Sequence, residues 1–107
     1  MATETIPTTV TPEAAALAKE YGVERELEAI LDKGREMVRG LRALEVDVEP
    51  WAEEGDLCIV VRAVIDPACD EDPSHLAWWS WRFDAFGLNT AARFLVVASP
   101  FGRWHGR

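Results

Sequence analysis

The stretch from His75 to Phe86 constrains the fold most, because it holds three of the five tryptophans and two of the four phenylalanines. Aromatic side chains bury large apolar areas, so the hydrophobic core is expected to form around this stretch. The spacing of its apolar residues fits both the period of a helix and the period of a strand. One set has the spacing of a helical stripe: Leu76, Trp79, Phe83 and Phe86. Alternate residues over 79–85 instead have the spacing of a strand.

The residues that flank the aromatic stretch favour a helix. Asp72 supplies a side-chain acceptor at the N-cap, and Pro73 has the fixed φ of a first helical residue. Gly87 can adopt the left-handed conformation that ends a helix. The enrichment in aromatic residues favours a strand by propensity. We therefore predict a helix and keep the strand as the alternative.

Two helices are predicted before the aromatic stretch. Thr11 and the following proline form a helix start, and Gly22 ends this short helix. A longer helix is predicted over residues 23–43, with Gly34 on its apolar stripe. A glycine inside a helix costs about 1 kcal/mol relative to alanine. Close approach of a tryptophan from the aromatic stretch would explain Gly34, and the alternative is a tolerated flaw.

Three strands are predicted from the remaining apolar segments. Residues 44–51 alternate between apolar and acidic side chains, which is typical of a strand with one wet face. Residues 52–56 are predicted to form a hairpin loop. Residues 57–65 are apolar at nearly every position except Arg62, which favours the centre of a sheet. The third strand covers residues 94–98.

This order of elements predicts an α+β fold, a two-layer α-β-β-α-β sandwich with helices packed on one face of a small, mostly antiparallel sheet. We expect a polar N-terminal arm at residues 1–10, one domain at 11–100 and a basic aromatic tail at 101–107. A small sheet with apolar edge strands needs protection. Sheet extension or helix packing across a two-fold axis provides it, so a homodimer is predicted.

Charge and composition narrow the class of protein. With 11 basic and 19 acidic residues, the 107-residue chain carries a net charge of −8. Such a surface disfavours nucleic acid and anionic membranes as partners. We find no signal peptide and no segment long enough to span a bilayer, and two cysteines are too few for a disulfide framework. A cytoplasmic, bacterial protein is expected.

The chain resembles small bacterial proteins that have no assigned activity. The resemblance covers residues 23–100 and is carried by the runs LEVDVEPWAEEGDLCIVVRAVIDP, DPSHLAWWSWRFDAFG and RFLVVASP. It implies an α-β-β-α-β sandwich and a gene on a mobile cassette or beside toxin-like genes. It carries over no catalytic residue.

No cluster of chemically active residues forms a recognisable motif. The richest one offers thiolate, carboxylate and imidazole ligands: Asp66, Cys69, Asp70, Glu71, Asp72 and His75. Its spacing matches no zinc pattern, and a solvated acidic loop is the favoured interpretation. A cysteine nucleophile would need a histidine placed against it. A glycine-rich phosphate loop is missing from the sequence. We therefore predict neither a metal nor a cofactor.

Two functional hypotheses from different classes follow, and an enzyme ranks third. The first is a non-enzymatic protein-interaction or regulatory module, antitoxin-like and homodimeric. Its acidic strand face would receive a basic protein, through Glu45, Asp47 and Glu49. The second is a small-molecule binding protein with a pocket for apolar or cationic ligands. The tryptophans available to line it, besides Trp79, are Trp51, Trp78, Trp81 and Trp104. Trp78 and Trp81 lie off the predicted apolar stripe, so at least one of them should face a second surface, either another helix or subunit or a ligand.

Overall fold

The computed structural model describes residues 6–50, 57–69 and 71–100. The described residues form an α+β fold with a four-stranded mixed sheet. In chain order the elements are β1 (Thr8–Val10), α1 (Pro12–Tyr21), α2 (Glu24–Met37), β2 (Leu41–Pro50), β3 (Leu57–Ile65), the 3-10 helix η1 (Pro67–Cys69), α3 (Ser74–Phe86), α4 (Leu88–Ala91) and β4 (Phe94–Pro100). None of the described helices is long and apolar enough to cross a membrane.

The strand order is β1-β2-β3-β4, and the sheet is mixed rather than mostly antiparallel. Only β2 and β3 pair antiparallel, whereas β1 with β2 and β3 with β4 pair parallel. Helices return the chain between the members of each parallel pair, which is the connection that parallel pairing needs. The expectation of a mostly antiparallel sheet is therefore wrong. Part of the predicted arm contributes to the sheet, because residues 8–10 form β1.

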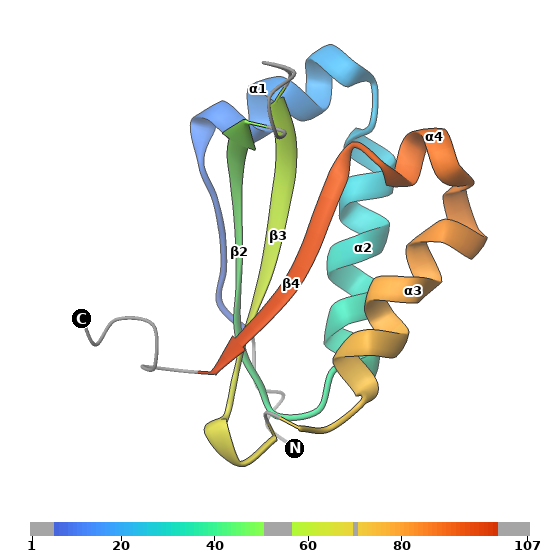
Figure 1. Ribbon diagram of the computed structural model, residues 1–107. Helices are drawn as coiled ribbons and strands as arrows, with labels where there is room; N and C mark the ends of the chain where they lie inside the picture. The colour runs from blue at the N-terminus through green and yellow to red at the C-terminus, as the bar shows by residue number, and fades with distance from the viewer. Residues whose placement is uncertain (1–5, 51–56, 70, 101–107) are drawn as a thin grey trace, which may run out of the picture.

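Helices α2 and α3 lie on the same face of the sheet (Figure 1), and the core fills the space between the two layers. Strand β3 is the best-buried strand, because it has a neighbour on each side and its apolar residues face both ways. Its central position agrees with the prediction. The largest fully buried side chains of the core come from both layers: Trp78, Phe94, Ile30, Leu44 and Ile59.

The short helix α1 begins and ends at its predicted residues. The Thr11 hydroxyl accepts the Ala14 N–H at 3.1 Å, and Gly22 ends the helix with φ of 70°. Helix α2 is shorter than the prediction of 23–43. The chain leaves the helix at Val38, which is extended, and Gly40 turns it with φ of 73° so that Leu41 can start β2. Pairing of Leu41 with Ile65 of β3 overrides the helical pattern there.

The aromatic stretch is a helix, as predicted, and the alternative of a strand is wrong. The Asp72 carboxylate accepts the Ser74 N–H at 2.9 Å, but the helix begins one residue later than predicted, with Pro73 at the N-cap and Ser74 as the first helical residue. Gly87 follows the last helical residue with φ of 82°. Residues 88–91 form the short helix α4. The predicted hairpin loop 52–56 and the tail 101–107 lie outside the described residues.

Candidate functional site

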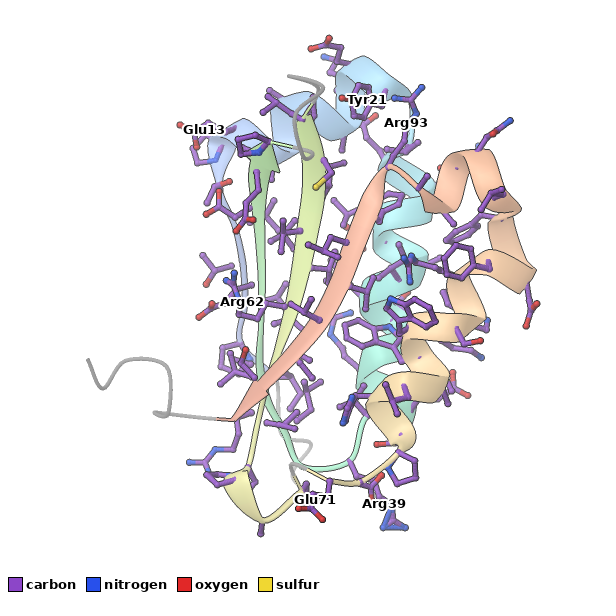
Figure 2. All side chains as sticks on the ribbon, in the orientation of Figure 1. Glu13, Tyr21, Arg39, Arg62, Glu71 and Arg93 are labelled. Atoms are coloured by element: carbon purple, nitrogen blue, oxygen red, sulfur yellow. The ribbon has the colours of Figure 1, made fainter. Side chains whose placement is uncertain are left out.

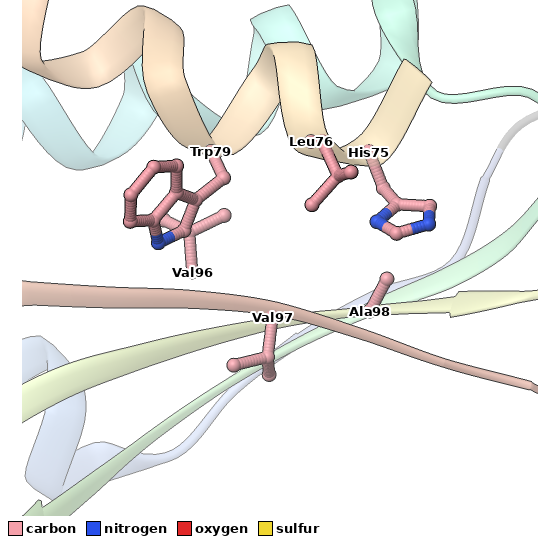
Figure 3. A pocket seen from close by; sticks show the side chains of 6 residues that line it. All are labelled: His75, Leu76, Trp79, Val96, Val97 and Ala98. Carbon is pink, nitrogen blue, oxygen red and sulfur yellow. The ribbon is translucent and has the colours of Figure 1, made fainter. Parts of the chain in front are cut away.

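An open groove runs between α3 and β4, and we refer to it as the α3–β4 groove. It has a volume of about 360 Å³, and six residues line it: His75, Leu76, Trp79, Val96, Val97 and Ala98. Figure 3 shows His75, Leu76 and Trp79 directed from α3 toward β4, with Val96 and Ala98 directed back toward the helix. Val97 also lines the groove, although its side chain points to the other side of the strand.

Trp78 fixes the orientation of α3 and thereby forms the groove. Its side chain is 1% exposed, and its indole Nε1 donates a hydrogen bond to the Ile30 carbonyl of α2 at 2.9 Å. A Cβ atom on Gly34 would lie 2.9 Å from Cζ2 of this indole, so only glycine leaves room for the ring. The predicted reason for Gly34, close approach of a tryptophan, is confirmed. With Trp78 directed at α2, the helical period of 3.6 residues turns Leu76 and Trp79 away from α2.

Consequently, the residues predicted as the buried stripe of α3 are partly exposed. Leu76 is 59% exposed and Trp79 is 42% exposed, while Phe83 and Phe86 are half-buried. Trp79 and Phe83 contact each other edge to face, with ring centroids 5.3 Å apart. The predicted stripe is therefore not the face of α3 that is buried in the core. The buried face is the one that carries Trp78, because this indole packs against α2 at Gly34. Leu76, Trp79 and Phe83 thus form an outward apolar stripe on α3.

In the sheet formed by the described residues, β4 is an edge strand. Ile59 of β3 donates its N–H to the Arg93 carbonyl at 2.9 Å, and it is in register with Phe94. Alternate residues of a parallel strand bond to the same neighbour. The N–H and C=O groups of Phe94, Val96 and Ala98 therefore point to the outer edge. The strand has no charged residue between Phe94 and Pro100.

Arg82 lies beside the groove and is only 5% exposed. It donates hydrogen bonds to the backbone carbonyls of Trp79 at 2.6 Å and Ala91 at 3.4 Å. Its guanidinium carbon is 5.0 Å from the ring centroid of Trp79 and 4.2 Å from that of Phe83. Burial lowers the pKa of Arg82 from its ordinary value. These contacts attach α4 to α3 and hold the Trp79 ring in place.

The predicted acidic residues lie on the sheet face turned away from α2 and α3, where Figure 2 shows Arg62. Arg62 contacts Glu45 at 3.4 Å and Glu49 at 4.0 Å. The Asp47 carboxylate accepts hydrogen bonds from the Thr11 hydroxyl at 3.4 Å and from the Val48 N–H. The acidic strand face is thus partly neutralised by β3, and it does not converge with the groove.

The predicted tryptophans are not brought together in one pocket. Trp78 belongs to the core, which corrects its assignment as a ligand or partner residue. Trp81 is half-buried and packs against the core, where its ring contacts Phe86 and has the Lys33 ammonium 5.6 Å from its centroid. Trp51 and Trp104 lie outside the described residues. The groove was not predicted from the sequence. A signal for it was present, because Trp78 and Trp79 are adjacent. If one indole packs against Gly34, the other must face outward.

The described residues contain no group of three or more histidine, cysteine, aspartate or glutamate side chains that could hold a metal ion. Two carboxylates of the acidic loop have structural roles, because Asp66 contacts Arg42 at 3.3 Å and Asp72 accepts the Ser74 N–H at the start of α3. Burial and then the nearby Glu49 carboxylate raise the pKa of the Cys58 thiol. That thiol therefore stays protonated at neutral pH and is a poor nucleophile.

The chain was compared with protein-family models, with curated proteins and with solved structures, and none of the three comparisons gave a match.

Proposed function

We propose that the chain is a protein-interaction module without catalytic activity, which binds an extended strand of a protein at the outer edge of β4. The observation that carries this proposal is the coincidence of two features at one place. The edge of β4 offers outward hydrogen-bonding groups, and the α3–β4 groove offers an apolar wall beside the same strand. Strand addition uses both, since main-chain bonds give affinity and side-chain pockets give specificity.

The chemistry of the groove indicates which strand it would take. Its described lining is apolar apart from His75, and neither these lining residues nor β4 include a carboxylate or a lysine. A bound strand would direct alternate side chains at Leu76 and Trp79, so an uncharged strand with large apolar side chains fits best. Natural edge strands usually carry charges, bulges or prolines that prevent such pairing, and β4 has none of these before Pro100.

The experiment is a titration of the protein with a short blocked peptide of alternating threonine and valine, followed by NMR of the backbone amides. We expect shifts and slower exchange at the outward amides of Phe94, Val96 and Ala98. The same peptide with alternate backbone nitrogens methylated is the control, because it keeps the side chains but cannot complete the ladder. The proposal is abandoned if those three amides exchange freely in every sample, with or without peptide and at every protein concentration.

A small apolar ligand is the second candidate for the same groove, because a volume of about 360 Å³ is in the range of ligand sites. Among the described residues, one indole lines the groove, that of Trp79, and none of the lining residues is a carboxylate that would attract a cation. An Ala98→Pro variant separates the two candidates. It removes an outward N–H but keeps an apolar lining, so strand binding should weaken at least tenfold while binding of naphthalene as a probe persists.

A further inference from the structure

We infer that the strand that β4 receives is β4 of a second copy of this chain, so that the protein is a two-fold dimer with a continuous sheet. This inference rests on the proposed strand addition and names its partner. In this dimer the outer edges of the two β4 strands meet, and so do the outward apolar stripes of the two α3 helices.

Both layers of the sandwich end in an incomplete apolar surface on the same side. In the sheet layer it is the outer edge of β4. In the helix layer it is the outward stripe of α3, where Leu76 is 59% exposed and Trp79 is 42% exposed. A single peptide strand would extend the sheet layer only. A second copy, related by a two-fold axis perpendicular to the sheet, places its own α3 beside this stripe and completes both layers.

The outward groups of β4 are complementary to themselves in one antiparallel register. If Val96 lies opposite Val96 of the second copy, Phe94 lies opposite Ala98 and Ala98 lies opposite Phe94. All three residues direct their N–H and C=O groups outward, and each such pair exchanges two hydrogen bonds. If the two strands are shifted by two residues from this register, in either direction, one of the three residues loses its partner. It then lies opposite a residue that has no N–H or that does not face outward. The strand thus specifies its own register.

The charge distribution permits this contact although the chain carries a net charge of −8. The six residues that line the α3–β4 groove include no carboxylate, and β4 itself is uncharged. In the register centred on Val96, the Arg93 that precedes β4 lies opposite Ser99 of the second copy. No pair of like charges would face each other along the strands, so the surface is suited to another copy of the same acidic chain.

The test is the solution mass by light scattering over a wide range of protein concentration. We expect twice the chain mass of 12.0 kDa for the wild type. Ala98→Pro and Leu76→Lys should each raise the dimer dissociation constant at least tenfold, with unchanged circular dichroism. Ala98→Pro acts on the sheet layer and Leu76→Lys on the helix layer. Val10→Lys is the matched control, because Val10 is a 38% exposed apolar residue on the opposite edge strand, and this variant should remain dimeric.

Two results would overturn the inference. One is a wild type that keeps the mass of a single chain at the highest concentration reached. The other is a dimer whose dissociation constant neither variant changes, because its interface would then lie elsewhere. Amide exchange distinguishes this failure from failure of the proposed function. If a monomeric wild type protects Phe94, Val96 and Ala98 only when the threonine-valine peptide is added, strand addition stands and only the partner is wrong.

Discussion

At the scale of single residues, the contact between Gly34 and Trp78 determines which surface α3 presents. The indole packs against the backbone of α2 and hydrogen bonds to the Ile30 carbonyl. Since one helical face cannot bury adjacent indoles, burial of Trp78 leaves Trp79 for the groove. The candidate site therefore depends on a glycine that lies outside it.

We expect Gly34→Ala to destabilise the protein although alanine is the better helix former. The new Cβ would lie 2.9 Å from a buried indole that cannot move freely, and overpacking costs about 1–3 kcal/mol. Better helix propensity offsets about 1 kcal/mol of this. A net loss of up to about 2 kcal/mol should appear in urea unfolding.

A double-mutant cycle tests the cause of that loss. In a Trp78→Phe background the smaller ring leaves space for the methyl group, so Gly34→Ala should cost less there than in the wild type. Equal costs in both backgrounds would show that the indole is not what Gly34 accommodates.

The pH dependence of stability should contain a contribution from Asp72. Hydrogen bonds from the Ser74 backbone and then its side chain, followed by weaker effects of Arg39 and His75, hold the pKa of Asp72 below its ordinary value of 3.8. A lowered pKa in the folded state stabilises the protein above the ordinary value, and this contribution is lost as the pH falls through the folded-state pKa. In urea unfolding at a series of pH values, the stability difference between wild type and Asp72→Asn should shrink below pH 3.8. A constant difference would contradict the role of the carboxylate charge.

At the scale of elements, β4 has two unlike edges. Its inner edge completes the ladder with β3 over the whole strand, and its outer edge meets no described strand. Backbone N–H groups of successive β4 residues therefore alternate between bonding to β3 and pointing to the outer edge. The sequence FLVVASP has no alternation of polar and apolar residues that would reveal this.

Proline substitutions at adjacent positions should reveal these two edges. Val97→Pro removes an N–H that bonds to β3, whereas Ala98→Pro removes one that points outward and proline is tolerated at edges. We expect Val97→Pro to cost at least about 2 kcal/mol more than Ala98→Pro in the free energy of unfolding. Because the proposed dimer would add stability of its own, both variants are best compared at the lowest protein concentration that the measurement allows. Similar costs would mean that the assignment of inward and outward groups is wrong.

At the scale of the whole molecule, the acidic face of β2 and the apolar α3–β4 groove lie on opposite sides of the sheet. Glu45 and Glu49 of β2 contact Arg62 on the far face of the sheet, and none of the described residues that line the groove is a carboxylate. Two copies with a net charge of −8 repel one another at a distance, whereas the surface through which we propose that they meet is uncharged.

Salt should therefore strengthen self-association. Raising the ionic strength shortens the Debye length from about 10 Å at 0.1 M to about 3 Å at 1 M, which screens the repulsion between the copies. Apolar contacts and main-chain bonds are affected far less. We expect the dimer dissociation constant to fall severalfold over this range in light scattering. A dissociation constant that rises with salt would indicate ion pairs across the interface instead.

Local patterns in the sequence determined the element types, because caps, glycine turns and hydrophobic periods act over a few residues. The start of α1 at Thr11, the helix over the aromatic stretch, the central strand β3 and the need for a large ring above Gly34 were all predictable in this way. The end of α2 was not, because pairing of Leu41 with Ile65 competes with a helical pattern that continues past Met37. Non-local pairing also made the sheet mixed.

Only the tertiary structure decided which face of α3 is buried. The sequence offers several apolar stripes around this helix, and their periods alone do not rank them. Packing of Trp78 against Gly34 selected one of these stripes, and it left Leu76 and Trp79 beside the edge of β4. A candidate site composed of a helix face and a strand edge depends on contacts between segments far apart in the chain. Periodicity within one segment carries no information about such contacts.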